Sequence, residues 1–105
     1  MKHTDYSDRY DRESDEAPYM LLTITLQEFY GVNAYVEHTG GGVFVIKIDL
    51  SKNKVVLVTL DDDNTWTVGK YDTTNSEDEG IGVASGLYFH QALHAIHAWV
   101  ITDVR

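Results

Sequence analysis

The middle of the chain constrains the fold most strongly, because its large apolar side chains recur at every second position, which is the period of a β-strand. Short polar segments separate these stretches, and connections of this length join neighbouring antiparallel strands. The predicted strands are residues 34–38, 43–50, 55–60 and 65–71, with turns at 40–42, 51–54 and 61–64. The sequence therefore predicts an antiparallel meander of three to four strands.

After a polar loop at residues 72–82, the apolar period changes to that of a helix. An apolar stripe recurs every three or four residues from Phe89 to Val100, which predicts a long amphipathic helix from about residue 86 to about residue 101, with Ser85 as its N-cap. Strands followed by a final helix indicate an α+β domain with that helix packed on one sheet face. The residues expected to face the helix are Phe44, Ile46, Ile48, Val56, Val58, Trp66 and Val68.

Residues 1–17 differ from the rest, because acidic side chains dominate them and large apolar groups are few. This composition predicts a mobile acidic tail that precedes a single domain of residues 18–105. Tyr6 and Tyr10 stand four positions apart, so a short amphipathic helix that orders on a partner or on the domain is the alternative. Pro18 marks the expected boundary, because the residue before a proline avoids the helical conformation.

Two local structures compete for the segment that follows Pro18. Thr25 and Glu28 fit a capping box, which predicts a short helix over residues 26–30 that Gly31 closes. The alternation of apolar residues with threonines favours a strand over residues 19–26 instead. A short N-terminal helix or strand is therefore expected here.

Length and composition exclude several classes of protein. The 105 residues suit one domain, and the absence of cysteine excludes disulfides and thiolate metal sites. No apolar run is long enough for a membrane helix and the acidic N-terminus is unlike a signal peptide, so a cytoplasmic protein without membrane association is expected. The net charge of −9 argues against direct binding of nucleic acid, which requires a basic surface.

Two blocks of acidic residues flank the strand predicted at residues 65–71. The strand between the two blocks separates them by about 20–25 Å. Rows of carboxylates at this distance resemble nucleic-acid phosphates and suit a basic protein surface. The alternative explanations are that aspartate favours turns and that acidic residues keep the protein soluble. The predicted partner-binding residues are Asp61, Asp62, Asp63, Asp72, Glu77, Asp78 and Glu79.

The second face of the predicted sheet is more apolar than a solvated face should be. Such a patch is typical of an interface. The predicted interface residues are Tyr35, Val43, Val45, Leu57 and Tyr71. Burial beneath residues 19–30 is one explanation, and contact with a second copy or with another protein is the other.

His90, His94 and His97 lie on one side of the predicted final helix, at a spacing from which two imidazoles can reach one metal. Gln91 stands where helical zinc sites of proteases carry a glutamate, and a further ligand would have to come from elsewhere, for example His38. A polar helix face without metal or cofactor is therefore expected, and the three histidines remain candidates only. No nucleophile elbow or phosphate-binding loop is present, so the chain is predicted not to be an enzyme.

These observations favour a small acidic interaction protein that inhibits or modulates a protein partner by occupying its basic nucleic-acid-binding site. In composition the chain is similar to small, acidic, cysteine-free anti-restriction and anti-CRISPR inhibitors of phages and mobile elements. One alternative is a homodimeric regulatory domain whose sheet face forms the dimer interface. Another is a metal or small-ligand binder that uses the helix histidines.

Overall fold

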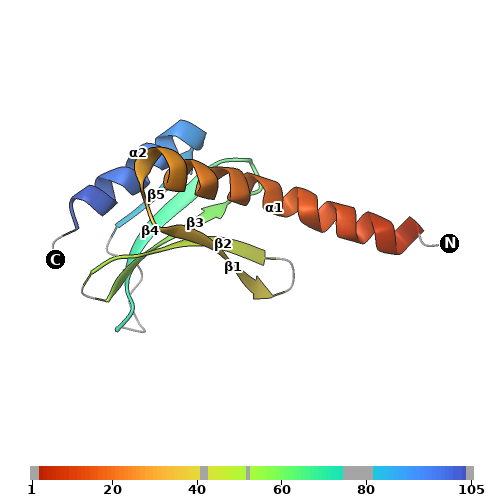
Figure 1. Cartoon of the computed structure of the whole chain (residues 1–105), viewed down its shortest axis with the longest axis horizontal. Coiled ribbons are helices and arrows are strands. Elements are labelled where there is room, and N and C mark those ends of the chain that lie inside the picture. Colours follow the sequence, from red (N-terminus) through yellow and green to blue (C-terminus); the bar gives the residue numbers. More distant parts are fainter. Residues whose placement is uncertain (1–2, 41–42, 52, 75–81, 104–105) are drawn as a thin grey trace.

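The computed structural model describes residues 3–40, 43–51, 53–74 and 82–103. Their elements are α1 (His3–Tyr30), β1 (Ala34–Gly40), β2 (Val43–Asp49), β3 (Lys54–Leu60), β4 (Trp66–Asp72), β5 (Gly82–Leu87) and α2 (Phe89–Ile101). The strands form an antiparallel sheet in the order β1-β2-β3-β4-β5, with one helix before it and one after it (Figure 1). The α+β class and the antiparallel meander are confirmed.

The sheet has five strands rather than three to four, because residues 82–87 form an edge strand beside β4. The sequence of β5, Gly-Val-Ala-Ser-Gly-Leu, has low strand propensity, so pairing with β4 decides its conformation. Ser85 lies inside this strand, and its prediction as a helix N-cap was wrong. Tyr88 precedes α2 instead, and its backbone N–H donates to the Gln91 side chain over 2.8 Å.

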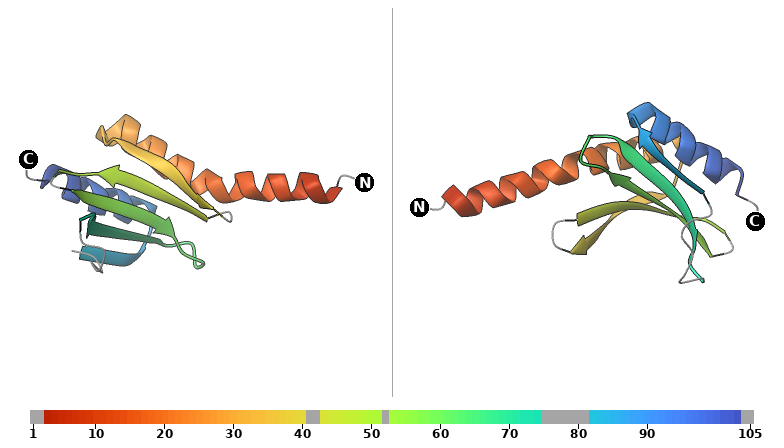
Figure 2. Two further views of the ribbon diagram at one scale, coloured as in Figure 1. Left: turned by 90° about the horizontal axis from the view of Figure 1, so that it is seen from below. Right: turned by 180° about the vertical axis from the view of Figure 1, so that it is seen from behind.

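Both helices lie on the same side of the sheet, with α1 over β1 and β2 and α2 over β4 and β5 (Figures 1 and 2). All seven residues predicted to face the final helix belong to the buried hydrophobic cluster between these layers. The Tyr19 ring lies within it, 5.7 Å from the Phe44 ring and 5.4 Å from the Trp66 ring between centroids. The helices contribute to this cluster Tyr19, Leu22, Leu26, Ala92, Leu93 and Ile96.

Helix α1 replaces both structures predicted for residues 19–30. Leu22 and Leu26 are fully buried, whereas Ile24 is 47% exposed, so burial follows the helical period and the strand prediction was wrong. The capping box was also wrong, because Thr25 lies inside the helix. Its hydroxyl donates to the Leu21 carbonyl over 2.8 Å, as threonines within helices commonly do.

Helix α1 continues through the boundary predicted at Pro18, which lies inside it. Proline lacks a backbone N–H, so the helix loses one hydrogen bond there. The backbone is helical from His3 to Tyr30. The predicted end at Tyr30 is confirmed, because Gly31 follows with a φ of +64°. Neither α1 nor α2 combines the length and the apolar content that a bilayer-spanning helix needs.

Candidate protein-binding face

The sheet surface turned away from both helices is called the open face here. A row of paired residues crosses it with one residue from each strand: Tyr35, Lys47, Leu57, Gly69 and Val83. These positions alternate with the buried positions of the helix-side cluster, and none of them belongs to it. The strand period therefore defines a second surface that spans the full width of the sheet.

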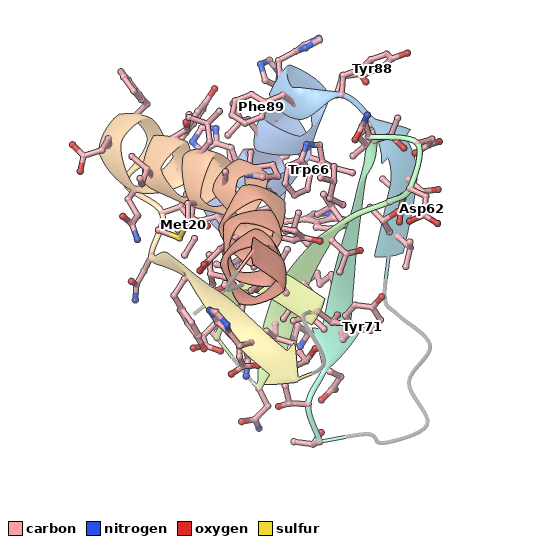
Figure 3. The ribbon with its side chains drawn as sticks, turned by 90° about the vertical axis from the view of Figure 1, so that its right-hand side faces the viewer. Met20, Asp62, Trp66, Tyr71, Tyr88 and Phe89 are labelled. Atoms are coloured by element: carbon pink, nitrogen blue, oxygen red, sulfur yellow. The ribbon has the colours of Figure 1, made fainter. Side chains whose placement is uncertain are left out.

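Residues 19–30 do not cover the open face, which corrects one of the two explanations given above. Tyr19, Leu22 and Leu26 of this segment pack into the helix-side cluster instead. Figure 3 shows the same division, with Trp66 between the helices and the sheet, and Tyr71 on the side turned away from the helices. Among the described residues, no helix lies over the open face.

The predicted interface residues differ in how much surface they offer. Tyr35 is 38% exposed and Val43 is 57% exposed, whereas Val45 is only 9% exposed. Val45 can therefore offer little surface to a partner. Val83 is 53% exposed and was not predicted, since β5 was not recognised as a strand.

The Tyr71 ring lies over the backbone of Gly69, two residues earlier on the same strand, β4. A β-carbon built on Gly69 would stand 2.5 Å from Tyr71 Oη and 2.7 Å from one ring carbon. Glycine is therefore required there for this ring position, because any larger residue would displace the ring. The aromatic ring occupies the part of the open face where Gly69 itself contributes no side chain.

The turn between β3 and β4, Asp61–Asn64, is called the acidic turn here. Asp61 accepts a hydrogen bond from the Thr67 hydroxyl over 2.6 Å, and Asp63 accepts from the Thr65 hydroxyl over 2.6 Å. The Thr65 backbone N–H also donates to Asp63 over 3.1 Å. These two hydrogen bonds from Thr65 hold the pKa of the Asp63 carboxyl below its ordinary value. Two of the three aspartates thus shape the turn as hydrogen-bond acceptors.

Asp62 is exposed, like Asp61 and Asp63, and it points away from the helices (Figure 3). A carboxylate has about four acceptor sites, so the hydrogen bonds within the turn leave the other aspartates able to accept more. The acidic turn is therefore both a local structure and a negatively charged projection.

The structure does not bring the predicted acidic residues together. Asp72 stands at the opposite end of β4 from the acidic turn, paired in register with Lys54. It accepts from the Thr74 hydroxyl over 2.7 Å and from the Thr74 backbone N–H over 2.9 Å, and these hydrogen bonds lower the pKa of its carboxyl. Glu77, Asp78 and Glu79 lie outside the described residues.

Asp49 and Tyr88 were not among the predicted interface or partner-binding residues. Asp49 accepts a hydrogen bond from Tyr35 over 3.1 Å, so an acidic group also stands on the open face itself. Partial desolvation and this carboxylate raise the pKa of the Tyr35 phenol above its ordinary value. Tyr88 is 62% exposed. It follows Leu87, which pairs with Trp66 at the end of the sheet that also carries the acidic turn. Strand alternation placed Asp49 on this face, whereas no signal in the sequence marks Tyr88.

The candidate histidines form no shared site. His97 packs against Tyr30, with 5.0 Å between ring centroids, whereas His90 and His94 are exposed. His38 lies on β1 and contacts Glu16, with Nε2 3.2 Å from Oε2. Within the described part of the chain, no three histidine or acidic side chains lie close enough to hold a metal ion.

Comparison with protein-family models, with curated proteins and with solved structures finds no significant match to this chain. The geometry of the open face and of the acidic turn therefore carries the functional argument alone.

Proposed function

We propose that this protein binds a basic site on another protein through the open face and the acidic turn, and that it acts by occupying that site rather than by catalysis. The observation that carries the proposal is an uncovered sheet face with apolar and aromatic side chains and an acidic projection at one end. Apolar surface of this kind supplies affinity, and acidic groups supply orientation and a fast association rate.

The acidic turn and the open face form one continuous surface. Thr67 pairs with Thr59 at strand positions that alternate with the buried residues of β4, so its hydroxyl lies on the open face. Asp61 accepts the hydrogen bond from that hydroxyl, which ties the acidic turn to the edge of the face. A partner seated on the apolar row would therefore contact the carboxylates of the turn without a change in the sheet.

The arrangement of charge favours a site that normally binds nucleic acid. The acidic turn and Asp72 mark the two ends of β4, a seven-residue strand, and Asp49 adds a carboxylate at the end of β2. At the rise of a strand the two ends lie about 20–25 Å apart, a distance over which a nucleic-acid backbone places several phosphates. An anti-restriction or anti-CRISPR type of inhibitor is the class of protein that this surface suits.

Affinity capture from the native cell, followed by mass spectrometry and by binding measurements on the captured protein, tests the proposal. Replacing Asp61, Asp62 and Asp63 together by Asn keeps the turn-forming residue type, so folding should survive. The association rate should fall, and binding should become less sensitive to salt, because steering depends on the net field. Unchanged affinity and unchanged salt dependence would contradict a role for the acidic turn.

The open face is tested separately by Val83→Lys, which places a cation on an exposed position of β5. Binding to a basic partner should weaken by about tenfold or more, since the substitution removes apolar contact and adds repulsion. Ile101→Lys is the matched control, because Ile101 is 66% exposed on α2, on the other side of the sheet. Equal losses in both variants would contradict a role for the open face.

The homodimer remains the second candidate, because the same uncovered face suits a second copy. Light scattering separates the two. A monomer at micromolar concentration supports the proposal, whereas a dimer that Val83→Lys dissociates supports the alternative.

A further inference from the structure

Helix α1 carries exposed apolar side chains that do not belong to the helix-side cluster. Met20 is 39% exposed, Leu21 is 58% exposed and Ile24 is 47% exposed. At about 100° per residue, these three side chains fall within about 100° of arc. Leu21 and Ile24 lie on the side of the helix opposite Leu22 and Leu26, whereas Met20 lies at the border of this side, next to β1 (Figure 3). These three residues are called the outer stripe.

The outer stripe has the spacing and chemistry of a helix-binding surface. Ile24 is a neighbour of Met20 at i+4 and of Leu21 at i+3 on the helix surface, and these are the spacings used when one amphipathic helix packs along another. Methionine adapts its shape to such partners more easily than branched side chains do. A helix with apolar residues on all sides is normally buried on all sides. The sheet covers only the side of α1 that carries Tyr19, Leu22 and Leu26.

Helix α1 also extends far beyond the sheet toward the N-terminus (Figures 1 and 2). A helix without a packing partner is marginal below about 12–15 residues in water. The extension continues directly from the outer stripe, so a helix that docks on the stripe would run alongside it and could stabilise it.

Charge determines which partner fits this surface. No lysine or arginine occurs from residue 13 to residue 46. Glu28 is exposed at one end of the outer stripe, and Glu16 stands at the other end, where one of its carboxylate oxygens contacts His38. The acidic residues of positions 1–17 precede it. In a pair of identical helices, acidic groups would meet acidic groups in either orientation, which opposes association. A helix with lysine or arginine beside its apolar residues has the complementary charge.

We propose that the outer stripe of α1 is a docking site for a basic amphipathic helix of another protein, separate from the open face. The partner would place apolar side chains on Met20, Leu21 and Ile24 and its cationic side chains beside the acidic residues at the ends of the stripe. This surface lies on the opposite side of the molecule from the open face, so both could be occupied together.

The test is a titration of the isotope-labelled full chain, followed by nuclear magnetic resonance, with a synthetic helical peptide of leucine and lysine. A peptide of the same composition in scrambled order and a leucine–glutamate peptide are the controls. We expect shifts at the amides of residues 17–28 with the ordered basic peptide only, and weaker binding at higher salt.

The double variant Leu21→Gln with Ile24→Gln should weaken binding by about tenfold or more, because it removes most of the apolar contact. Both positions are exposed, so circular dichroism should show an unchanged fold. Phe29→Gln is the matched control, since Phe29 is 82% exposed on the same helix but lies about 80° around it from Leu21. Its affinity should stay unchanged.

Three results would overturn the proposal: equal affinity of the double variant and the wild type, equal binding of the scrambled peptide, or shifts on the open face rather than along α1. A homodimer that the double variant dissociates would also overturn it, because the second copy would then be the occupant. Of these results only shifts on the open face bear on that face, and its own variants test it separately.

Discussion

Residues 22 and 24 provide a direct test of how the segment 19–30 packs. In a strand, Leu22 and Ile24 would point to the same side and be buried together, whereas α1 buries Leu22 fully and leaves Ile24 47% exposed. Leu22→Ala should lower the free energy of unfolding by about 2–5 kcal/mol, the cost of the lost apolar contacts plus the cavity left behind. For a domain of this size that corresponds to a fall in Tm of roughly 10 °C or more.

Ile24→Ala should cost about 1 kcal/mol or less, because only half of the side chain is removed from water and alanine has the higher helix propensity. Urea unfolding followed by tryptophan fluorescence measures both variants, since Trp66 is 3% exposed in the cluster that α1 covers. Equal destabilisation by the two substitutions would refute the helical packing and restore the strand.

Three further results are expected. Tyr19→Phe should cost about 1–3 kcal/mol in urea unfolding, because the backbone N–H of Leu60, which donates to the Tyr19 hydroxyl over 3.0 Å, loses its acceptor; an unchanged midpoint would contradict that contact. Gly69→Ala should displace the Tyr71 ring, shifting its proton resonances while the core stays intact, and unchanged ring resonances would contradict the ring position. The lowered pKa of the Asp63 carboxyl means that its ionised form stabilises the folded protein. This stability is present above the ordinary carboxyl pKa of 3.8 and is lost as the pH falls through the lowered value. Asp63→Asn should therefore reduce the loss of stability on acidification. Identical acid profiles of the variant and the wild type would contradict this role.

The sheet was predictable where one period dominates the sequence. In β2 the large apolar residues alternate, and the polar turns on both sides fix the strand ends, so local pattern and tertiary packing agree. The helical stripe of α2 was found for the same reason. The start of α2 was placed too early, because β5 has a composition that suits a turn and becomes a strand only beside β4.

Helix α1 was not predictable, because the segment is apolar on both sides. Leu22 and Leu26 fit a helical stripe, but Leu22 and Ile24 fit a strand equally well, and only the packing against the sheet distinguishes them. The same uncertainty left open which side of the sheet residues 19–30 cover. The sequence predicted the open face from strand alternation, whereas its exposure depended on the placement of α1.

The candidate acidic site was predictable in composition and not in geometry. The acidic turn and Asp72 stand at opposite ends of β4, and threonine donors engage them locally, which no charge count reveals. Asp49 was placed on the open face by alternation, but its hydrogen bond with Tyr35 depends on the register between β1 and β2.

The most direct test of the central claim is competition between this protein and nucleic acid for the captured partner. The partner is immobilised and the binding of this protein is measured while duplex DNA or RNA is added at constant salt. If the open face and the acidic turn occupy a nucleic-acid-binding site, nucleic acid should displace the protein, and the variant with Asp61, Asp62 and Asp63 replaced by Asn should be displaced at a lower concentration. Simultaneous binding of both ligands to the partner would contradict the account.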